Sequence, residues 1–146
     1  MRHLRQVEQF ALVWRRVRAT VRRRAALRID RPFQQLRALK VIRDEDVRTQ
    51  AALAERLMID PPAASRLIDR LVDDGLVERR AGADRRCVRL VTRKGADAAI
   101  AIFDEVIDEV DQQLRAHLTA AEARALRDLL DKLAAAVADD APPPAG

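Results

Sequence analysis

Apolar residues recur along the chain at spacings that predict mostly helices. Near the N-terminus they fall three and four positions apart, the repeat of a single stripe along one helix. That stripe comprises Leu4, Val7, Phe10, Ala11, Trp14, Val17 and Val21. Asp30 and Pro32 interrupt it, and Pro32 can open a second helix that the acidic run 44–46 ends. The apolar positions of this second helix are Phe33, Leu36, Leu39 and Ile42.

The middle of the chain predicts two short helices followed by a β-hairpin. Thr49 is a suitable N-cap for the first helix, and Asp60 followed by Pro61 starts the second, which Gly75 stops. Two short alternating runs then flank small and polar residues, a pattern typical of a hairpin. The predicted segments are helices 49–58 and 61–74 and strands 76–80 and 87–91. We expect Leu67, Leu71 and Val72 to pack the second helix.

Two further helices are predicted towards the C-terminus. Thr92 is expected to cap a long helix, whose apolar residues repeat nearly every three and a half positions. These residues are Ala96, Ile100, Phe103, Ile107, Val110 and Leu114. Thr119 and Glu122 form a capping box for a last, leucine-rich helix. The fold class is therefore mainly α with a small β-hairpin wing, followed by a proline-rich tail at 141–146 that we expect to be disordered.

The net charge of +5 hides an uneven distribution. Basic residues dominate the first third of the chain, and acidic residues dominate the part after residue 95. The basic run on the first helix could contact DNA flanks, could be a solvated face, or could face the acidic long helix in a dimer, and the charge split favours the last reading. The residues concerned are Arg15, Arg16, Arg18, Arg22, Arg23 and Arg24, against Asp104, Glu105, Asp108, Glu109 and Asp111.

Composition argues against several classes of protein. No uncharged apolar run of about 18 residues occurs, so we expect no membrane span. The charged start, 1–10, does not resemble a signal peptide, and we expect a cytoplasmic protein. Cys87, His3 and His117 lie on different predicted elements, so no metal site or catalytic constellation is predicted. We expect a protein that is not an enzyme and carries no cofactor.

The two short helices have the dimensions of a helix-turn-helix, whose second helix fits the DNA major groove. Arginine on the outer face of that helix can donate two hydrogen bonds to guanine or grip a phosphate. The alternative is that Arg66 and Arg70 pair with Asp69, Asp73 or Asp74. Hairpin arginines could enter the minor groove. The candidate DNA contacts are Pro62, Ala63, Ser65, Arg66 and Arg70 on the helix and Asp84, Arg85 and Arg86 at the hairpin tip.

The segment TQAALAERLMIDPPAASRLIDRLVDDGLVERR, followed by DRR and VTRKG, resembles the multiple antibiotic resistance regulator (MarR) family over about residues 49 to 95. The resemblance implies a homodimer that binds a palindromic operator in double-stranded DNA. It further implies a repressor that a small aromatic or phenolic ligand releases. The implied regions are an N-terminal dimerisation helix (1–30), a winged helix-turn-helix region (31–94, with helix-turn-helix 49–74 and wing 76–92) and C-terminal dimerisation helices (95–140).

Carried onto this sequence, the recognition helix is Pro61 to Asp74, and the family's Asp-x-Arg wing feature falls on Asp84 and Arg86. Family members often have serine or threonine where this chain has Pro62 and Ala63. Base reading must therefore rely on Ser65, Arg66 and Arg70. The hairpin is also about one residue pair shorter than usual, which leaves Arg85 or Arg86 at its tip, and we expect Arg86. The carboxylate of Asp84 would orient a wing arginine.

Two residues have alternative interpretations. Trp14 could pack in the core or the dimer, or it could line a ligand site with Asp69 and Arg86, as in urate-responsive members of the family. Cys87 could be a redox sensor activated by neighbouring arginines, or a half-buried strand residue. A helical interaction module that does not bind DNA is a third possibility for the whole chain, although it would not account for a basic hairpin.

Overall fold

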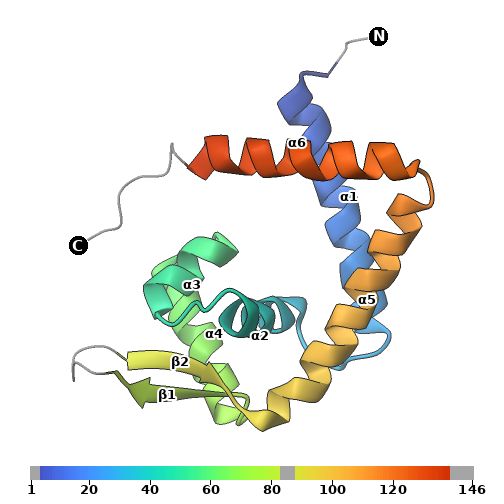
Figure 1. Cartoon of the computed structure of the whole chain (residues 1–146). Helices are drawn as coiled ribbons and strands as arrows, with labels where there is room; N and C mark the ends of the chain where they lie inside the picture. The colour runs from blue at the N-terminus through green and yellow to red at the C-terminus, as the bar shows by residue number, and fades with distance from the viewer. Residues whose placement is uncertain (1–3, 83–87, 139–146) are drawn as a thin grey trace. The chain divides into compact units, whose positions relative to one another are not determined.

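The computed structural model describes residues 4–82 and 88–138 (Figure 1). The described residues up to 108 form one compact unit, and those from 109 onwards form a second. The elements are α1 (Gln6–Ala26), α2 (Phe33–Asp44), α3 (Gln50–Leu57), α4 (Pro61–Asp73), β1 (Val77–Ala81), β2 (Val88–Thr92), the 3₁₀ turn η1 (Lys94–Ala96), α5 (Asp97–Arg115) and α6 (Ala120–Ala138). The predicted fold class, helices with a small hairpin, is confirmed. None of the described helices is long and apolar enough to cross a bilayer.

The predicted caps define the ends of α3 and α4. The Thr49 hydroxyl accepts a hydrogen bond from the Ala52 backbone N–H at 3.1 Å, and the Asp60 carboxylate accepts one from the Ala63 N–H at 2.7 Å. Each cap satisfies a backbone donor that the first helical turn cannot pair internally. After α4 the chain turns at Gly75, whose φ of +72° is readily adopted only by glycine. The helix-turn-helix at 49–74 is therefore set largely by local residues.

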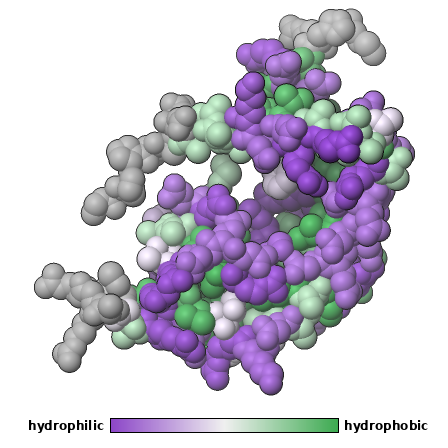
Figure 2. All heavy atoms as spheres, in the orientation of Figure 1, coloured by the Kyte–Doolittle hydropathy of each residue, from purple (hydrophilic) through white to green (hydrophobic). Residues whose placement is uncertain are grey.

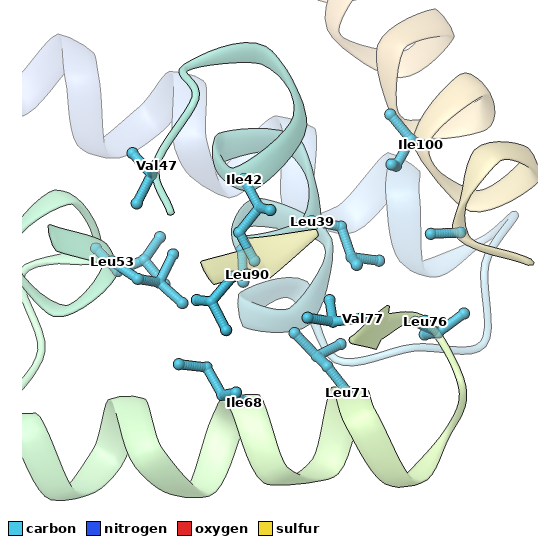
Figure 3. Close-up of a cluster of buried hydrophobic side chains, with 13 residues drawn as sticks. Leu39, Ile42, Val47, Leu53, Ile68, Leu71, Leu76, Val77, Leu90 and Ile100 are labelled. Atoms are coloured by element: carbon cyan, nitrogen blue, oxygen red, sulfur yellow. The ribbon is translucent and has the colours of Figure 1, made fainter. Parts of the chain in front are cut away.

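A buried apolar cluster joins α2, α3, α4, the hairpin and the start of α5 (Figure 3). Ile68 and Leu71 of α4 are completely buried, and Leu67 and Val72 lie at the cluster's edge. The prediction that Leu67, Leu71 and Val72 pack the helix is therefore confirmed, although Ile68, which was not predicted, is completely buried while Leu67 and Val72 are only partly so. The cluster includes Leu39, Ile42, Val47, Leu53, Leu57, Leu76, Val77, Leu90, Ala96 and Ile100. It fixes the orientation of α4 against α2.

The hairpin pairs β1 with β2 in antiparallel register, with Val77 opposite Thr92. The prediction that Thr92 caps the long helix is therefore wrong, because its backbone belongs to the sheet. The Arg93 N–H donates to the Leu76 carbonyl at 2.8 Å, so the chain stays beside β1 for one residue more. The 3₁₀ turn η1 then intervenes before α5 begins at Asp97.

A second buried cluster joins α1, α2 and α5. Ala25, Leu36, Phe103 and Val106 form its centre, and the rings of Phe33 and Phe103 meet edge to face with centroids 5.9 Å apart. Phe103 was predicted on the apolar seam of the long helix, and its burial confirms that position. Val106 was not predicted and is completely buried.

The second unit contains the end of α5 and all of α6. The predicted capping box is present: the Thr119 N–H donates to the Glu122 carboxylate at 2.8 Å, and the Glu122 N–H donates to the Thr119 hydroxyl at 3.2 Å. No described residue of α6 is buried. Its exposed apolar residues are Leu126, Leu129, Leu130, Leu133 and Val137.

The first half of α1 likewise leaves its apolar stripe uncovered. Its exposed apolar residues are Val7, Phe10, Val13 and Trp14. On the face shown in Figure 2, hydrophilic residues cover most of the first unit, with smaller apolar areas between them. The described residues thus bury the centre of the fold and leave the apolar faces of α1 and α6 exposed.

Candidate nucleic-acid interface

The outer face of α4 carries most of the predicted contact residues. Pro62, Arg66 and Arg70 are exposed, and Ala63 and Ser65 are half-buried. The opposite face, with Ala64, Ile68 and Leu71, is buried in the core. Because the caps and the core fix the helix on one side, its polar side is presented to solvent in one orientation.

Arg66 and Arg70 are unpaired. Neither side chain forms a hydrogen bond or an ion pair with any residue in the described part of the chain. Two of the carboxylates that the sequence offered them are held by other arginines. Asp69 binds Arg79 of β1 at 2.5 Å, and Asp74 binds Arg31 at 2.9 Å. Both guanidinium groups on the α4 face are therefore available to an anion or a base edge.

The hairpin carries further arginines on its two strands. Arg79 lies opposite Leu90 on the face turned to the core, whereas Arg80 lies opposite Arg89 on the outer face. Arg80 is paired with Glu78 of its own strand. The predicted tip residues Asp84, Arg85 and Arg86, together with Cys87, lie outside the described residues. Their assignments, including the redox interpretation of Cys87, stay predictions.

Ion pairs bind α2 to α5. The Lys40 ammonium donates to Asp104 at 2.5 Å and to Asp44 at 2.8 Å, and Arg43 donates to the same carboxylates at 2.7 and 2.6 Å. The hydrogen bonds from Arg43, then Lys40, lower the pKa of Asp44 to about 2. Burial alone would raise the pKa of Asp104, but its bonds to Lys40 and Arg43 outweigh that effect and lower it.

This network corrects one expectation from the sequence. Asp104 was counted among the acidic residues that would face the basic first helix in a dimer. It instead accepts hydrogen bonds from α2 of its own chain. Charge asymmetry along a sequence predicts attraction between segments, but it cannot tell which basic segment lies within hydrogen-bond distance.

A cavity of about 450 Å³ lies beside Trp14. Its apolar wall includes Phe33, Phe103 and Ile107, and its polar lining includes Arg18 and Arg37. The Arg18 guanidinium lies 5.8 Å from the centre of the Phe33 ring, a cation–π arrangement. Burial, and secondarily the charge of Arg18, lowers the pKa of Arg37. The lining also includes Lys40 and Arg56 and the carboxylates of Asp44 and Glu45, so the cavity combines aromatic surface with more basic than acidic groups.

The predicted ligand group is only partly assembled around this cavity. Trp14 lines it, as that interpretation requires. Asp69 is not among the described lining residues, and its carboxylate binds Arg79. Arg86 lies outside the described residues. The residues that do join Trp14 here, Arg18 and Arg37, were not singled out from the sequence as ligand contacts.

Comparison with known proteins identifies this arrangement. Residues 29–86, from before α2 into the hairpin, match the sequence model of the MarR family. Wild-type apo MarR from E. coli has the same fold, with a TM-score of 0.75, 26% identity and coverage of 90% of this chain and 98% of that one. The transcriptional regulator PA3341 matches with a TM-score of 0.76, 27% identity and coverage of 90% and 96%. The chain therefore has the fold of MarR-family regulators, and its segment 29–86 matches that family's sequence model.

A third structure shows the same fold at lower identity. The S. aureus MepR–DNA complex has a TM-score of 0.73 and 20% identity, and the match covers 92% of this chain and 99% of that one. The long coverage shows that the outer helices, as well as the winged centre, follow the MarR fold. The sequence resembles the family at residues 49–95, and the structural similarity covers almost the whole chain.

Within this MarR fold, the ion pairs of two arginines, Arg79 and Arg31, were not predicted from the sequence. Arg79 follows buried Val77 by two residues in β1, and strand alternation alone would have placed it on the side facing α4. Arg31 donates to Gln35 at 3.1 Å and to Asp74 at 2.9 Å from the turn between α1 and α2. No periodic pattern marks that position, because its partner Asp74 is distant in sequence.

Proposed function

We propose that this protein is a dimeric, sequence-specific DNA-binding transcription regulator, a repressor that a small aromatic ligand releases from its operator. The observation that carries the proposal is the exposed, unpaired Arg66 and Arg70 on the outer face of α4. Arginine without a carboxylate partner can contact guanine or phosphate without first breaking an ion pair. The MepR structure with the same fold is a DNA complex, which supports this assignment.

In this proposal α4 lies in the major groove and the hairpin tip in the adjacent minor groove. Arg66 and Arg70 read base edges and Ser65 contacts a base or a phosphate. Pro62 and Ala63 contact the groove without side-chain hydrogen bonds. Arg86 enters the minor groove, with Asp84 and Arg85 beside it. Because a dimer presents two such units, the operator has two half-sites about 10 base pairs apart, centre to centre.

Selection from a random-sequence DNA library, followed by fluorescence anisotropy, tests this function. Arg66→Ala and Arg70→Ala should each weaken binding to the selected site by about 1–3 kcal/mol and relax the preference at one base pair. Arg115→Ala on α5 is the matched control, because its exposed side chain pairs only weakly with Asp111 at 3.7 Å. If no enriched sequence binds, or if all three variants bind as the wild type does, the DNA-binding assignment is wrong.

We also propose that the regions 1–30 and 95–140 form the homodimer. The support is the apolar stripes of α1 and α6, which are exposed in the single chain. Apolar faces of this length are normally covered in a soluble protein. Leu133→Glu should convert the dimer to a monomer in sedimentation velocity, whereas Lys132→Glu, at the preceding residue of α6, should leave it intact. A wild-type monomer at all concentrations would contradict the dimer.

The cavity beside Trp14 is our candidate for the ligand site. An aromatic carboxylate would place its ring against Phe33 and Phe103 and its charge near Arg18 and Arg37. Binding there would favour a spacing of the two α4 helices that does not match the operator.

Fluorescence of Trp14, the chain's single tryptophan, reports on this cavity directly. Salicylate and urate should quench it and release the wild type from DNA. Arg37→Gln should weaken both effects, whereas Arg15→Gln, an exposed position on α1 outside the cavity lining, should change neither. Unchanged fluorescence with both ligands would argue against this cavity as the site.

A further inference from the structure

A second, basic groove of about 380 Å³ lies on the outer face of the hairpin. Four arginines line it, Arg43, Arg48, Arg80 and Arg89, with Asp46 as the acidic residue. Arg80 and Arg89 face each other across the two strands and point to the same side of the sheet. Leu90, the neighbour of Arg89, is buried on the opposite side. Leu90 and Ile42 of the buried cluster nevertheless form part of the groove lining, whereas no described residue of α4 does.

Arg89 differs from the other arginines of this groove. Arg43 is bound by Asp44 and Asp104, Arg48 by Asp46, and Arg80 by Glu78. The Nε of Arg89 is buried, and no acceptor among the described residues lies within hydrogen-bond distance of it. Leaving a buried donor of a charged group without an acceptor is costly, so an acceptor from outside the described residues, such as a water, an ion or a ligand, would satisfy it. An anionic oxygen is the acceptor that a guanidinium prefers.

The position of the groove indicates which anion that is. Arg80 and Arg89 lie one pair from Ala81 and Val88, the last paired residues before the hairpin tip. One step along a strand is about 3.4 Å, so a tip inserted into a minor groove about 6 Å wide brings a sugar–phosphate strand to each side of the hairpin. On the inner side, Arg79 is already held by Asp69. On the outer side, the Nε of Arg89 has no hydrogen-bond partner among the described residues.

We propose that this groove binds a phosphate group of the DNA backbone beside the minor groove, with Arg89 as the residue that grips it. The inference rests on the DNA-binding function proposed above. It adds a contact that lies on the strands of the hairpin, separate from the tip residues and from the recognition helix. The contact is sequence-independent, because every nucleotide offers the same phosphate.

The salt dependence of operator binding tests this contact. Arg89→Gln should lower the slope of log K against log salt concentration by about 0.9 for each half-site and weaken binding about tenfold. Arg89→Lys should keep the slope and still lose affinity, because lysine retains the charge and lacks the Nε donor. Arg93→Gln is the matched control, since Arg93 follows β2 and does not line the groove. Thermal melting of each variant verifies that it is folded.

Neutral methylphosphonate substitutions, placed one at a time in the operator, locate the contact. The wild type should lose affinity at one phosphate flanking each minor-groove segment, and Arg89→Gln should be insensitive at that phosphate alone. If the wild type binds the operator and Arg89→Gln matches it in slope and phosphate sensitivity, this inference fails and the proposed function stands. If the wild type binds no DNA, the proposed function itself fails.

A free phosphate ion could accept the same hydrogen bonds from Arg89 as a phosphate of the DNA backbone. Millimolar inorganic phosphate, added without DNA, should not raise the melting temperature of the wild type more than that of Arg89→Gln. A phosphate-dependent rise confined to the wild type, together with insensitivity to methylphosphonates, would assign the groove to a free phosphate and overturn its assignment to DNA.

Discussion

Replacing Asp104 with asparagine should show how strongly α5 is tied to the helix that supports the winged unit. Asp104 accepts hydrogen bonds from Lys40 at 2.5 Å and Arg43 at 2.7 Å, and both donors come from α2. Asparagine has nearly the same shape, so it removes the charge and leaves the packing of the neighbouring Phe103 in place. The variant therefore isolates the electrostatic part of the α2–α5 contact.

The expected loss follows from the exposure of these groups. The side chains of Asp104, Lys40 and Arg43 are 33%, 31% and 34% exposed, between a buried pair and a solvated one. Exposed ion pairs contribute about 0.2–1 kcal/mol each, and hydrogen bonds to charged groups about 1.5–3 kcal/mol. Lys40 and Arg43 also keep Asp44 as a second partner. We therefore expect Asp104→Asn to cost about 1–2 kcal/mol, or about 2–8 °C in melting temperature.

The pH dependence provides an independent check. The pKa values of Asp44 and Asp104 are lowered in the folded protein, that of Asp44 to about 2. Carboxylates of this kind stabilise the fold fully above their unfolded pKa of about 4, and the contribution disappears as the pH falls through the folded pKa. The difference between wild type and Asp104→Asn should therefore be constant at neutral pH and shrink as the pH falls below about 4.

Urea denaturation followed by circular dichroism measures these differences, at one fixed protein concentration because a dimer's stability depends on it. Asp108→Asn is the matched control: Asp108 lies one turn further along α5, is exposed, and forms no ion pair with a described residue. Equal losses in the two variants, or a loss at Asp104 that does not shrink as the pH falls below about 4, would refute the role assigned to this network.

Three substitutions test the backbone and core of the helix-turn-helix, all by urea denaturation. Met58→Gly should stabilise the fold by about 0.5–1 kcal/mol, because Met58 has a φ of 55° and its side chain is 92% exposed. Gly75→Ala should cost about 1 kcal/mol through its positive φ alone, since an added Cβ would meet no atom within 4 Å. Ile68→Ala should cost about 2–5 kcal/mol, and Leu67→Ala clearly less; equal losses would contradict the observed rotation of α4.

Features that depend on residues a few positions apart could be predicted from the sequence. The caps at Thr49 and Asp60 and the box of Thr119 with Glu122 involve residues three apart, so their geometry follows once a helix begins. The rotation of α4 about its own axis was harder to predict, because apolar residues occupy positions 67, 68, 71 and 72. Two neighbouring faces of the helix fit that pattern, and only packing against α2 and the hairpin makes Ile68 the buried one.

Features that join distant segments could not be predicted in the same way. The partners of Asp104 lie 61 and 64 residues away, and Arg31 and Asp74 are 43 residues apart. Thr92 illustrates a local signal that a distant one overrides. Threonine before a helical pattern favours a cap, yet pairing with Val77 keeps Thr92 in the sheet. Each of these contacts depends on how the elements pack, which spacing within one element does not encode.

The candidate DNA-binding face combines both kinds of information. The sequence places Arg66 three residues before Asp69, and Arg70 four residues before Asp74, spacings at which helical ion pairs form readily. Arg79 from the hairpin and Arg31 from the turn before α2 bind those two carboxylates instead. Arg66 and Arg70 therefore do not pair with these carboxylates and can contact DNA. In the proposed complex, the affinity of the α4 face would depend on Arg79 and Arg31 without contact between either residue and DNA.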